Sequence, residues 1–107
     1  MKANVLGTEY KIKITNADTD PYLEDMDGYC DDTTKIIVVD EMLPNGYSKK
    51  DLKEYQKKVL RHEIIHAFLF ESGLADNSQW AKNEEMVDFF AIQFSKIYGV
   101  YKELGII

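Results

Sequence analysis

Residues 59–70 read VLRHEIIHAFLF and contain both histidines of the chain, His62 and His66, with Glu63 between them. Side chains at positions i and i+4 of a helix project from the same face, so the two imidazoles would point in one direction. The neighbouring residues are apolar, and burying two imidazoles among them costs free energy unless a partner satisfies their nitrogens. The stretch therefore predicts a partly buried helix that carries a polar site.

The apolar residues around this stretch predict a helix from about 49 to 72. They recur at helical spacing: Leu52, Tyr55, Val59, Ile65 and Leu69. Ser48 with Asp51 three residues later resembles a capping box at the start of the helix, and Gly73 is a natural stop at its end.

A second helix is expected from about 79 to 98, with Asn77 or Ser78 as its N-cap. Its buried stripe is expected to consist of Trp80, Val87, Ala91 and Phe94, with Phe90, Ile97 and Tyr98 beside it. Because the connection between the two helices is short, they should pack antiparallel.

The N-terminal half has the period of β-strands. Apolar and basic residues alternate in residues 9–15, EYKIKIT, and β-branched residues dominate 35–39, whereas residues 16–28 have the composition of a loop. The turn LPNG at 43–46 separates this half from the helices. We therefore predict an α+β fold, in which a small antiparallel or mixed sheet packs on two long antiparallel helices. The strand at 35–39 is a candidate edge to which an extended peptide could add.

Length and composition limit the class of protein. A chain of 107 residues suits one domain spanning residues 1–107, and a net charge of -6 with a pI near 4.8 argues against binding to nucleic acid. The single cysteine, Cys30, is interpreted as a half-buried strand residue, with a metal-seeking thiolate as the alternative. No apolar run is long enough for a membrane span and no signal peptide is evident. We expect a cytoplasmic protein that is a monomer.

Two histidines one turn apart can offer two nitrogens to one metal ion, and Glu63 can lie beside that ion as a general base without binding it. Counting along two antiparallel helices places Glu84 level with His66, and Asp88 level with His62. We predict Glu84 as the third metal ligand, with a first-turn acid favoured by the helix dipole as the alternative. Asp88 is predicted to accept the outer N–H of a ligating histidine, with simple solvation as the alternative.

These residues resemble a known family. HEIIHAFLFESGL followed by NEEMVDFFA is similar to the gluzincin type of zincin metallopeptidase, in which a third-ligand glutamate lies on a later helix. Asn83-Glu84 with Asp88 resembles the NE-x-x-x-D segment of thermolysin-like enzymes, and E-x-x-V-D-F-F-A is similar to a segment of the small ImmA/IrrE-like proteins of bacteria and phages. The resemblance covers about 40 residues, and the short chain suggests a minimal gluzincin of phage or prophage origin.

The resemblance implies a zincin-like fold and a zinc-dependent endopeptidase. His62, His66 and Glu84 would bind Zn²⁺, Glu63 would take a proton from metal-bound water, and Asp88 would orient a histidine. The partner would be a peptide or protein substrate. Two alternatives stay open: a metal-binding regulator with one specific partner and no general proteolysis, or a latent peptidase whose segment YKELGII caps the zinc through Glu103 or the terminal carboxylate.

Overall fold

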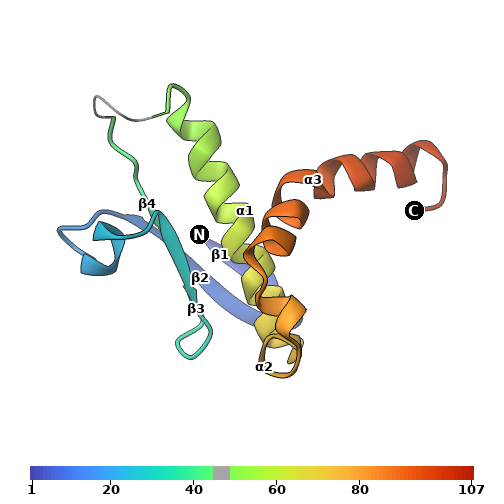
Figure 1. Ribbon diagram of the computed structural model, residues 1–107, viewed down its shortest axis with the longest axis horizontal. Coiled ribbons are helices and arrows are strands. Elements are labelled where there is room, and N and C mark those ends of the chain that lie inside the picture. Colours follow the sequence, from blue (N-terminus) through green and yellow to red (C-terminus); the bar gives the residue numbers. More distant parts are fainter. Residues whose placement is uncertain (45–48) are drawn as a thin grey trace.

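The computed structural model describes residues 1–44 and 49–107, and within these ranges the chain has the expected α+β fold (Figure 1). The N-terminal half forms a sheet from strands β1 (Lys2–Val5), β2 (Thr8–Thr15), β3 (Gly28–Asp31) and β4 (Ile36–Asp40), with a 3-10 turn, η1, at Pro21–Glu24. The C-terminal half contains two long helices, α1 (Leu52–Glu71) and α3 (Glu84–Glu103). The short helix α2 (Leu74–Asn77) and the 3-10 turn η2 (Gln79–Lys82) connect them.

The sheet is mixed, with strand order β1-β2-β4-β3. β2 and β4 pair in parallel, and the other neighbours pair antiparallel. β4 is therefore an inner strand, so the prediction that residues 35–39 form an edge is wrong. The consecutive burial of Ile37, Val38 and Val39 is typical of a strand covered on both faces. Among the described residues, the free edges of the sheet belong to β1 and β3.

β1 and β2 form a hairpin that the sequence patterns did not identify. Leu6 and Gly7 at its turn have φ values of 51° and 90°, the left-handed conformations that tight hairpin turns require. The side chain of Asn4 accepts a hydrogen bond from the Gly7 N–H at 2.8 Å. The Leu-Gly pair was thus the overlooked turn signal.

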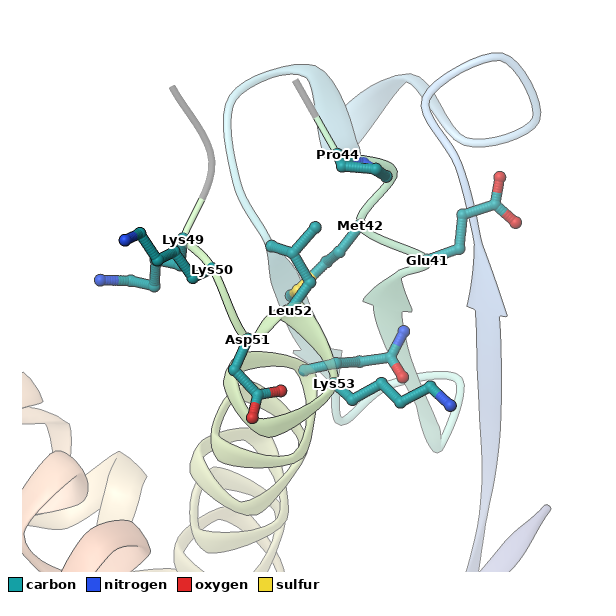
Figure 2. A pocket seen from close by; sticks show the side chains of 9 residues that line it. Glu41, Met42, Pro44, Lys49, Lys50, Asp51, Leu52 and Lys53 are labelled. Atoms are coloured by element: carbon teal, nitrogen blue, oxygen red, sulfur yellow. The ribbon is translucent and has the colours of Figure 1, made fainter. Parts of the chain in front are cut away.

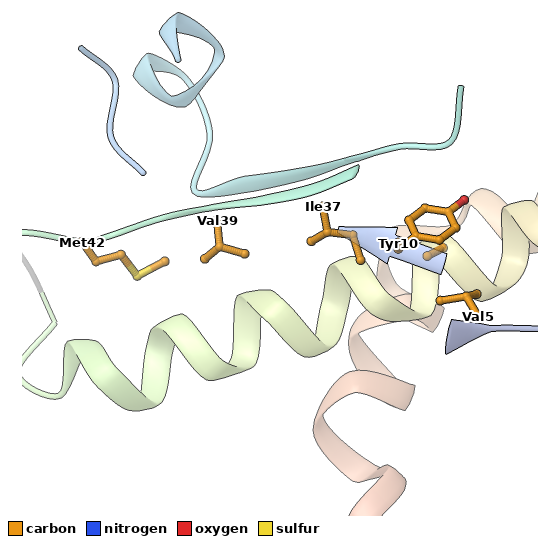
Figure 3. Close-up of a cluster of buried hydrophobic side chains, with 6 residues drawn as sticks. Val5, Tyr10, Ile37, Val39 and Met42 are labelled. Atoms are coloured by element: carbon orange, nitrogen blue, oxygen red, sulfur yellow. The ribbon is translucent and has the colours of Figure 1, made fainter. Parts of the chain in front are cut away.

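The core lies between the sheet and α1 (Figure 3). Its buried members come from three strands, the segment after β4 and the helix: Val5, Tyr10, Ile37, Val39, Met42 and Ala67. One face of α1 is thereby fixed against the sheet, and the opposite side of the helix is left for α3.

α1 begins slightly later than expected. Asp51 is its N-cap and accepts a hydrogen bond from the Glu54 N–H at 3.1 Å. The predicted cap Ser48 and the end of the predicted turn at 43–46 lie outside the described residues. At the other end Gly73 has a φ of 84°, which confirms it as the stop of the helix.

α3 begins at Glu84 rather than near residue 79, because α2 and η2 occupy the connection. Asn83, not Asn77 or Ser78, is its N-cap and accepts a hydrogen bond from the Met86 N–H at 2.9 Å. The expected stripe is correct only for Val87 and Ala91, since Trp80 is 52% exposed and Phe94 is 57% exposed. Within the ranges described, none of the helices has the length and apolar character needed to cross a membrane.

Candidate metal centre

The two histidines of α1 face each other across one helical turn. Their Nε2 atoms are 3.1 Å apart, and the imidazole rings meet edge to face. Donor atoms of His62, Glu63 and His66 all lie within 4.8 Å of one another, so this group could hold a metal ion. The i, i+4 spacing within one helix is sufficient to bring the imidazoles together.

Glu84, the first residue of α3, reaches both histidines. One carboxylate oxygen lies 2.9 Å from Nε2 of His62, and the other lies 2.9 Å from Nε2 of His66. The side chain is 67% exposed, so Glu84 does not share the burial of Val87 and Ala91 further along the helix. Glu84 is also a first-turn acid, as the alternative interpretation supposed, and this position directs its carboxylate to the histidines.

Asp88 lies one turn further along α3 and contacts Nδ1 of His62, the ring nitrogen that does not face Glu84. Its carboxylate accepts a hydrogen bond from the Nδ1–H of His62 at 2.7 Å. A neutral imidazole that is protonated at Nδ1 has a lone pair at Nε2. Asp88 therefore turns the Nε2 lone pair of His62 towards His66 and Glu84.

Glu63 is the buried acid of the site. It is 7% exposed, and its carboxylate lies within 4.8 Å of the ligand nitrogens of His62 and His66. Burial raises the pKa of its carboxyl group above the ordinary value of 4.5. Burial also lowers the pKa of His66 below 6.5, which favours the neutral imidazole that can act as a ligand.

β3 approaches α1 closely beside Glu63. A Cβ atom on Gly28 would lie 2.8 Å from Cγ1 of Val59, 2.9 Å from the Val38 carbonyl oxygen and 3.6 Å from Cγ of Glu63. Only glycine allows this approach without displacing the strand. Gly28 helps to form the site, whereas the sequence composition predicted the end of a loop there; a glycine at the start of a strand is a signal of close approach.

The donor atoms fit a small metal ion. A tetrahedral zinc with bonds of about 2.0–2.1 Å separates its ligand atoms by roughly 3.3 Å. The three contacts among His62, His66 and Glu84 measure 2.9, 2.9 and 3.1 Å. A proton can satisfy one of these contacts, whereas a cation bound by the two nitrogens and the carboxylate satisfies all three side chains at once.

A cleft of about 360 Å³ opens beside these groups. It is lined by Met26, Gly28, Tyr29, Cys30, His62, Glu63, His66, Phe70 and Glu84. A second hollow of about 210 Å³ continues past Asp27, Tyr55 and Asp88. Both hollows share Gly28, His62 and Glu63, so strand β3 forms one wall and the predicted centre forms the other.

Tyr29 lines the cleft and Tyr55 lines the second hollow, and the hydroxyl groups of both donate hydrogen bonds. The Tyr29 hydroxyl donates a hydrogen bond to Asp20, and the Tyr55 hydroxyl donates one to Asp27. Cys30 is half-buried in β3, as predicted, and burial raises the pKa of its thiol to about 12. Without a bound cation the thiol is therefore protonated at neutral pH, and the metal-seeking thiolate stays a prediction for a residue that lines the cleft.

The C-terminal segment lies away from the histidines. Glu103 ends α3, 19 residues after Glu84, which corresponds to about 28 Å along a helix. Figure 1 shows the second half of α3 extending outward from the rest of the molecule. The structure does not bring Glu103 or the terminal carboxylate to the predicted centre.

A different hollow, of about 590 Å³, lies at the start of α1 (Figure 2). Lysine side chains and Asp51 line it together with Glu41, Met42 and Pro44. None of the predicted site residues contributes to it, and it borders the segment that is not described. We assign it no role.

Comparison of the chain with protein-family models, with curated proteins and with solved structures gave no match. The interpretation of the site therefore depends on its own residues. His62, Glu63, His66, Glu84 and Asp88 lie together as the sequence predicted, and their chemical roles stay predictions.

Proposed function

We propose that this chain is a zinc-dependent metallopeptidase in which His62, His66 and Glu84 hold the ion. The observation that carries the proposal is the convergence of two imidazole nitrogens and a carboxylate at 2.9–3.1 Å, beside the buried acid Glu63, which lines the same cleft. Three protein ligands leave a position open, which is typical of catalytic rather than structural zinc sites.

Bound zinc would supply an activated water, by lowering its pKa to ~7, and would polarise a substrate carbonyl group. The chain would supply the proton transfers. Glu63 has a buried carboxylate that faces the cleft, so it can accept the proton of the attacking water and later deliver it to the leaving amine. Asp88 keeps the proton of His62 on Nδ1 and thus leaves Nε2 free as a ligand.

The substrate would bind along β3. This strand is an edge of the sheet and lines both hollows beside the histidines, so an extended peptide could add to it through main-chain hydrogen bonds. This replaces the earlier expectation for residues 35–39, which belong to an inner strand.

Zinc analysis and a peptide-library digest test the proposal together. The wild-type protein should bind one zinc and cleave peptides, while Glu63→Gln should retain zinc and lose about 10²- to 10⁴-fold in turnover. Glu85→Gln, which removes the exposed neighbour of Glu84, is the matched control and should change neither property. His62→Ala should lose both.

Two results would contradict the proposal. Equal turnover in wild type and Glu63→Gln would exclude Glu63 as the base. A zinc-loaded wild type that cleaves nothing in a broad library would favour the regulator that binds metal and one specific partner without proteolysis.

A further inference from the structure

The second half of α3 extends outward from the rest of the molecule and exposes several apolar side chains (Figure 1). α3 packs on α1 and meets η2, and Ala91 in its first half accepts a hydrogen bond from Arg61 of α1. Further along, Phe94 is 57% exposed, Tyr101 is 45% exposed and Leu104, just after the helix, is 67% exposed. Such a surface is unusual for a monomer, because large apolar patches generally mark an interaction site.

These residues form a regular seam. Phe90, Phe94, Ile97, Tyr101 and Leu104 follow one another at intervals of four, three, four and three residues. This is the spacing of the contact positions in a helix that pairs with another helix. The positions flanking the seam, Ala91, Gln93, Tyr98 and Val100, carry no charge. Despite a net charge of -6, two copies of this seam could therefore meet without repulsion between like charges.

An apolar groove lies beside the start of the seam. It measures about 350 Å³ between α1 and α3 and is lined by Arg61, Ile64, Ile65, Phe68, Phe90, Ala91 and Phe94. Arg61 is the charged member, and its Nε–H donates to the Ala91 carbonyl oxygen at 2.9 Å. The groove thus offers a wall of aliphatic and aromatic side chains to a second apolar helix.

The molecule exposes more surface than a compact monomer of its mass. Its accessible area is 7586 Å², against about 6,100 Å² expected for a monomer of 12.4 kDa. Its radius of gyration is 15.0 Å, against about 13 Å for a compact domain of this length. The excess of roughly 1,500 Å² exceeds the ~800 Å² that each partner buries in a standard interface.

We propose that the occupant of this surface is a second copy of the chain, bound through an antiparallel pairing of the two α3 helices. In that arrangement the outer half of each α3 lies in the apolar groove of the other copy. Because the two copies are related by a two-fold axis, the seam and the groove are buried in both of them. A parallel pairing would join the two outer halves and leave both grooves open. The inference does not depend on the peptidase activity, and it departs from the monomer expected from sequence alone.

Pairing of the seams in this direction predicts specific neighbours. With the two-fold axis between residues 95 and 96, Phe94 of one copy lies opposite Ile97 of the other, and Phe90 lies opposite Tyr101. The same axis separates the two copies of Phe90 by 11 residues along the helices, about 16 Å. That separation is far beyond the ~7 Å that a disulfide can bridge between Cα atoms.

Sedimentation equilibrium of the zinc-treated full chain tests the association. Wild type at tens of micromolar should have twice the mass of 12.4 kDa. Replacing Phe94 and Tyr101 together by glutamate should weaken the dimer at least ~100-fold. Because both side chains are exposed in the isolated chain, the helical circular dichroism and the zinc content should not change. Ile92→Glu, on an exposed position outside the seam, is the matched control and should remain a dimer.

Cysteine cross-linking tests the direction, in a Cys30→Ser background. A mixture of Phe90→Cys and Tyr101→Cys chains should form disulfide-linked heterodimers, and neither chain should cross-link alone. Self-cross-linking of Phe90→Cys would overturn the antiparallel arrangement. A wild type that stays monomeric at 100 μM, or a double glutamate variant that remains a dimer, would overturn the proposal and leave the surface to a different partner.

Discussion

Two polar clusters lie on α1, and they differ in how their charges are balanced. At the end of the helix, Glu71 accepts hydrogen bonds from Lys35 at 2.5 Å, Tyr10 at 2.8 Å and Thr8 at 3.1 Å. In the middle of the helix, His62, Glu63 and His66 meet Glu84 and Asp88. Among the described residues, no lysine or arginine forms an ion pair with any of these three acids.

The difference separates a structural cluster from a binding site. The Glu71 cluster contains its own cation and enough donors for both carboxylate oxygens, so it is complete within the protein. The histidine cluster combines two imidazoles with three acids and, among the described residues, no lysine or arginine, so a bound cation would balance its charge. Removing a residue of the histidine cluster should therefore change the stability that zinc adds, whereas removing a residue of the Glu71 cluster should not.

The largest expected effect is on zinc-dependent stability. Zinc at 100 times its dissociation constant should raise the free energy of unfolding of the wild type by about 2.7 kcal/mol. His66→Ala should lose this gain, because one of three ligands is removed, whereas Glu71→Gln should keep it. Thermal unfolding with zinc and with a chelator measures both. If zinc raised the thermal midpoint of His66→Ala as much as that of the wild type, the histidine cluster would not be the zinc site.

Gly28→Ala tests whether β3 really closes against the histidine cluster. The added Cβ would lie 2.9 Å from the Val38 carbonyl oxygen and 2.8 Å from Val59, and backbone cannot move aside easily. We expect destabilisation by about 1–3 kcal/mol in denaturant unfolding. Gly99→Ala on α3 meets nothing within 4 Å and should instead stabilise by about 0.5–1 kcal/mol. Wild-type stability in Gly28→Ala would mean that the strand does not pack this closely.

Asp88→Asn should weaken zinc binding about 10- to 100-fold without removing a ligand. The amide cannot hold the His62 Nδ1–H as strongly as the carboxylate does at 2.7 Å, so the Nε2 lone pair is less well fixed. Competition with a chromophoric chelator measures the affinity. Asp76→Asn, at an exposed position of α2, is the control. An unchanged affinity in Asp88→Asn would assign Asp88 to simple solvation.

The histidine cluster was predictable to the extent that helix geometry fixes it. His62, Glu63 and His66 lie within two turns of one helix, so their proximity needs no tertiary information. Glu84 was reached by counting along a helix that was expected to start near residue 79. The contact is present although that start was wrong, because α2 and η2 bring the first turn of α3 directly to the histidines.

What could not be predicted depended on partners distant in sequence. The alternation in residues 9–15 identifies a strand but not its parallel pairing with β4. The apolar pattern of α3 continues past Ala91 without change, yet α1 covers only the first part of it. Spacing shows which residues share a face, and only the tertiary structure shows whether that face is covered.

A smaller effect is expected from Tyr10→Phe in the complete cluster. The substitution removes the hydroxyl that donates to Glu71 at 2.8 Å and leaves the buried ring in place. We expect a loss of about 0.5–1.5 kcal/mol in the free energy of unfolding and no change in zinc affinity. Tyr22→Phe, on an exposed ring, should change neither quantity. A weaker zinc affinity in Tyr10→Phe would show that the two clusters are coupled through α1.

The smallest effect is the pH dependence of the complete cluster. Hydrogen bonds from Lys35 and then Tyr10 lower the pKa of Glu71 below its ordinary value of 4.5. The unfolded chain therefore binds this proton first as the pH falls, so the stabilisation by Glu71 is fully present above about pH 4.5 and is lost as the pH falls through the lowered pKa. The thermal midpoints of metal-free wild type and Glu71→Gln should differ at pH 7 and approach each other below pH 4. The protein must be treated with a chelator, because protonated histidines release metal. Otherwise the loss of metal-dependent stability at the histidine cluster would add to the effect of Glu71. A midpoint difference that stays constant down to pH 3 would show that the carboxylate charge of Glu71 does not contribute to its cluster.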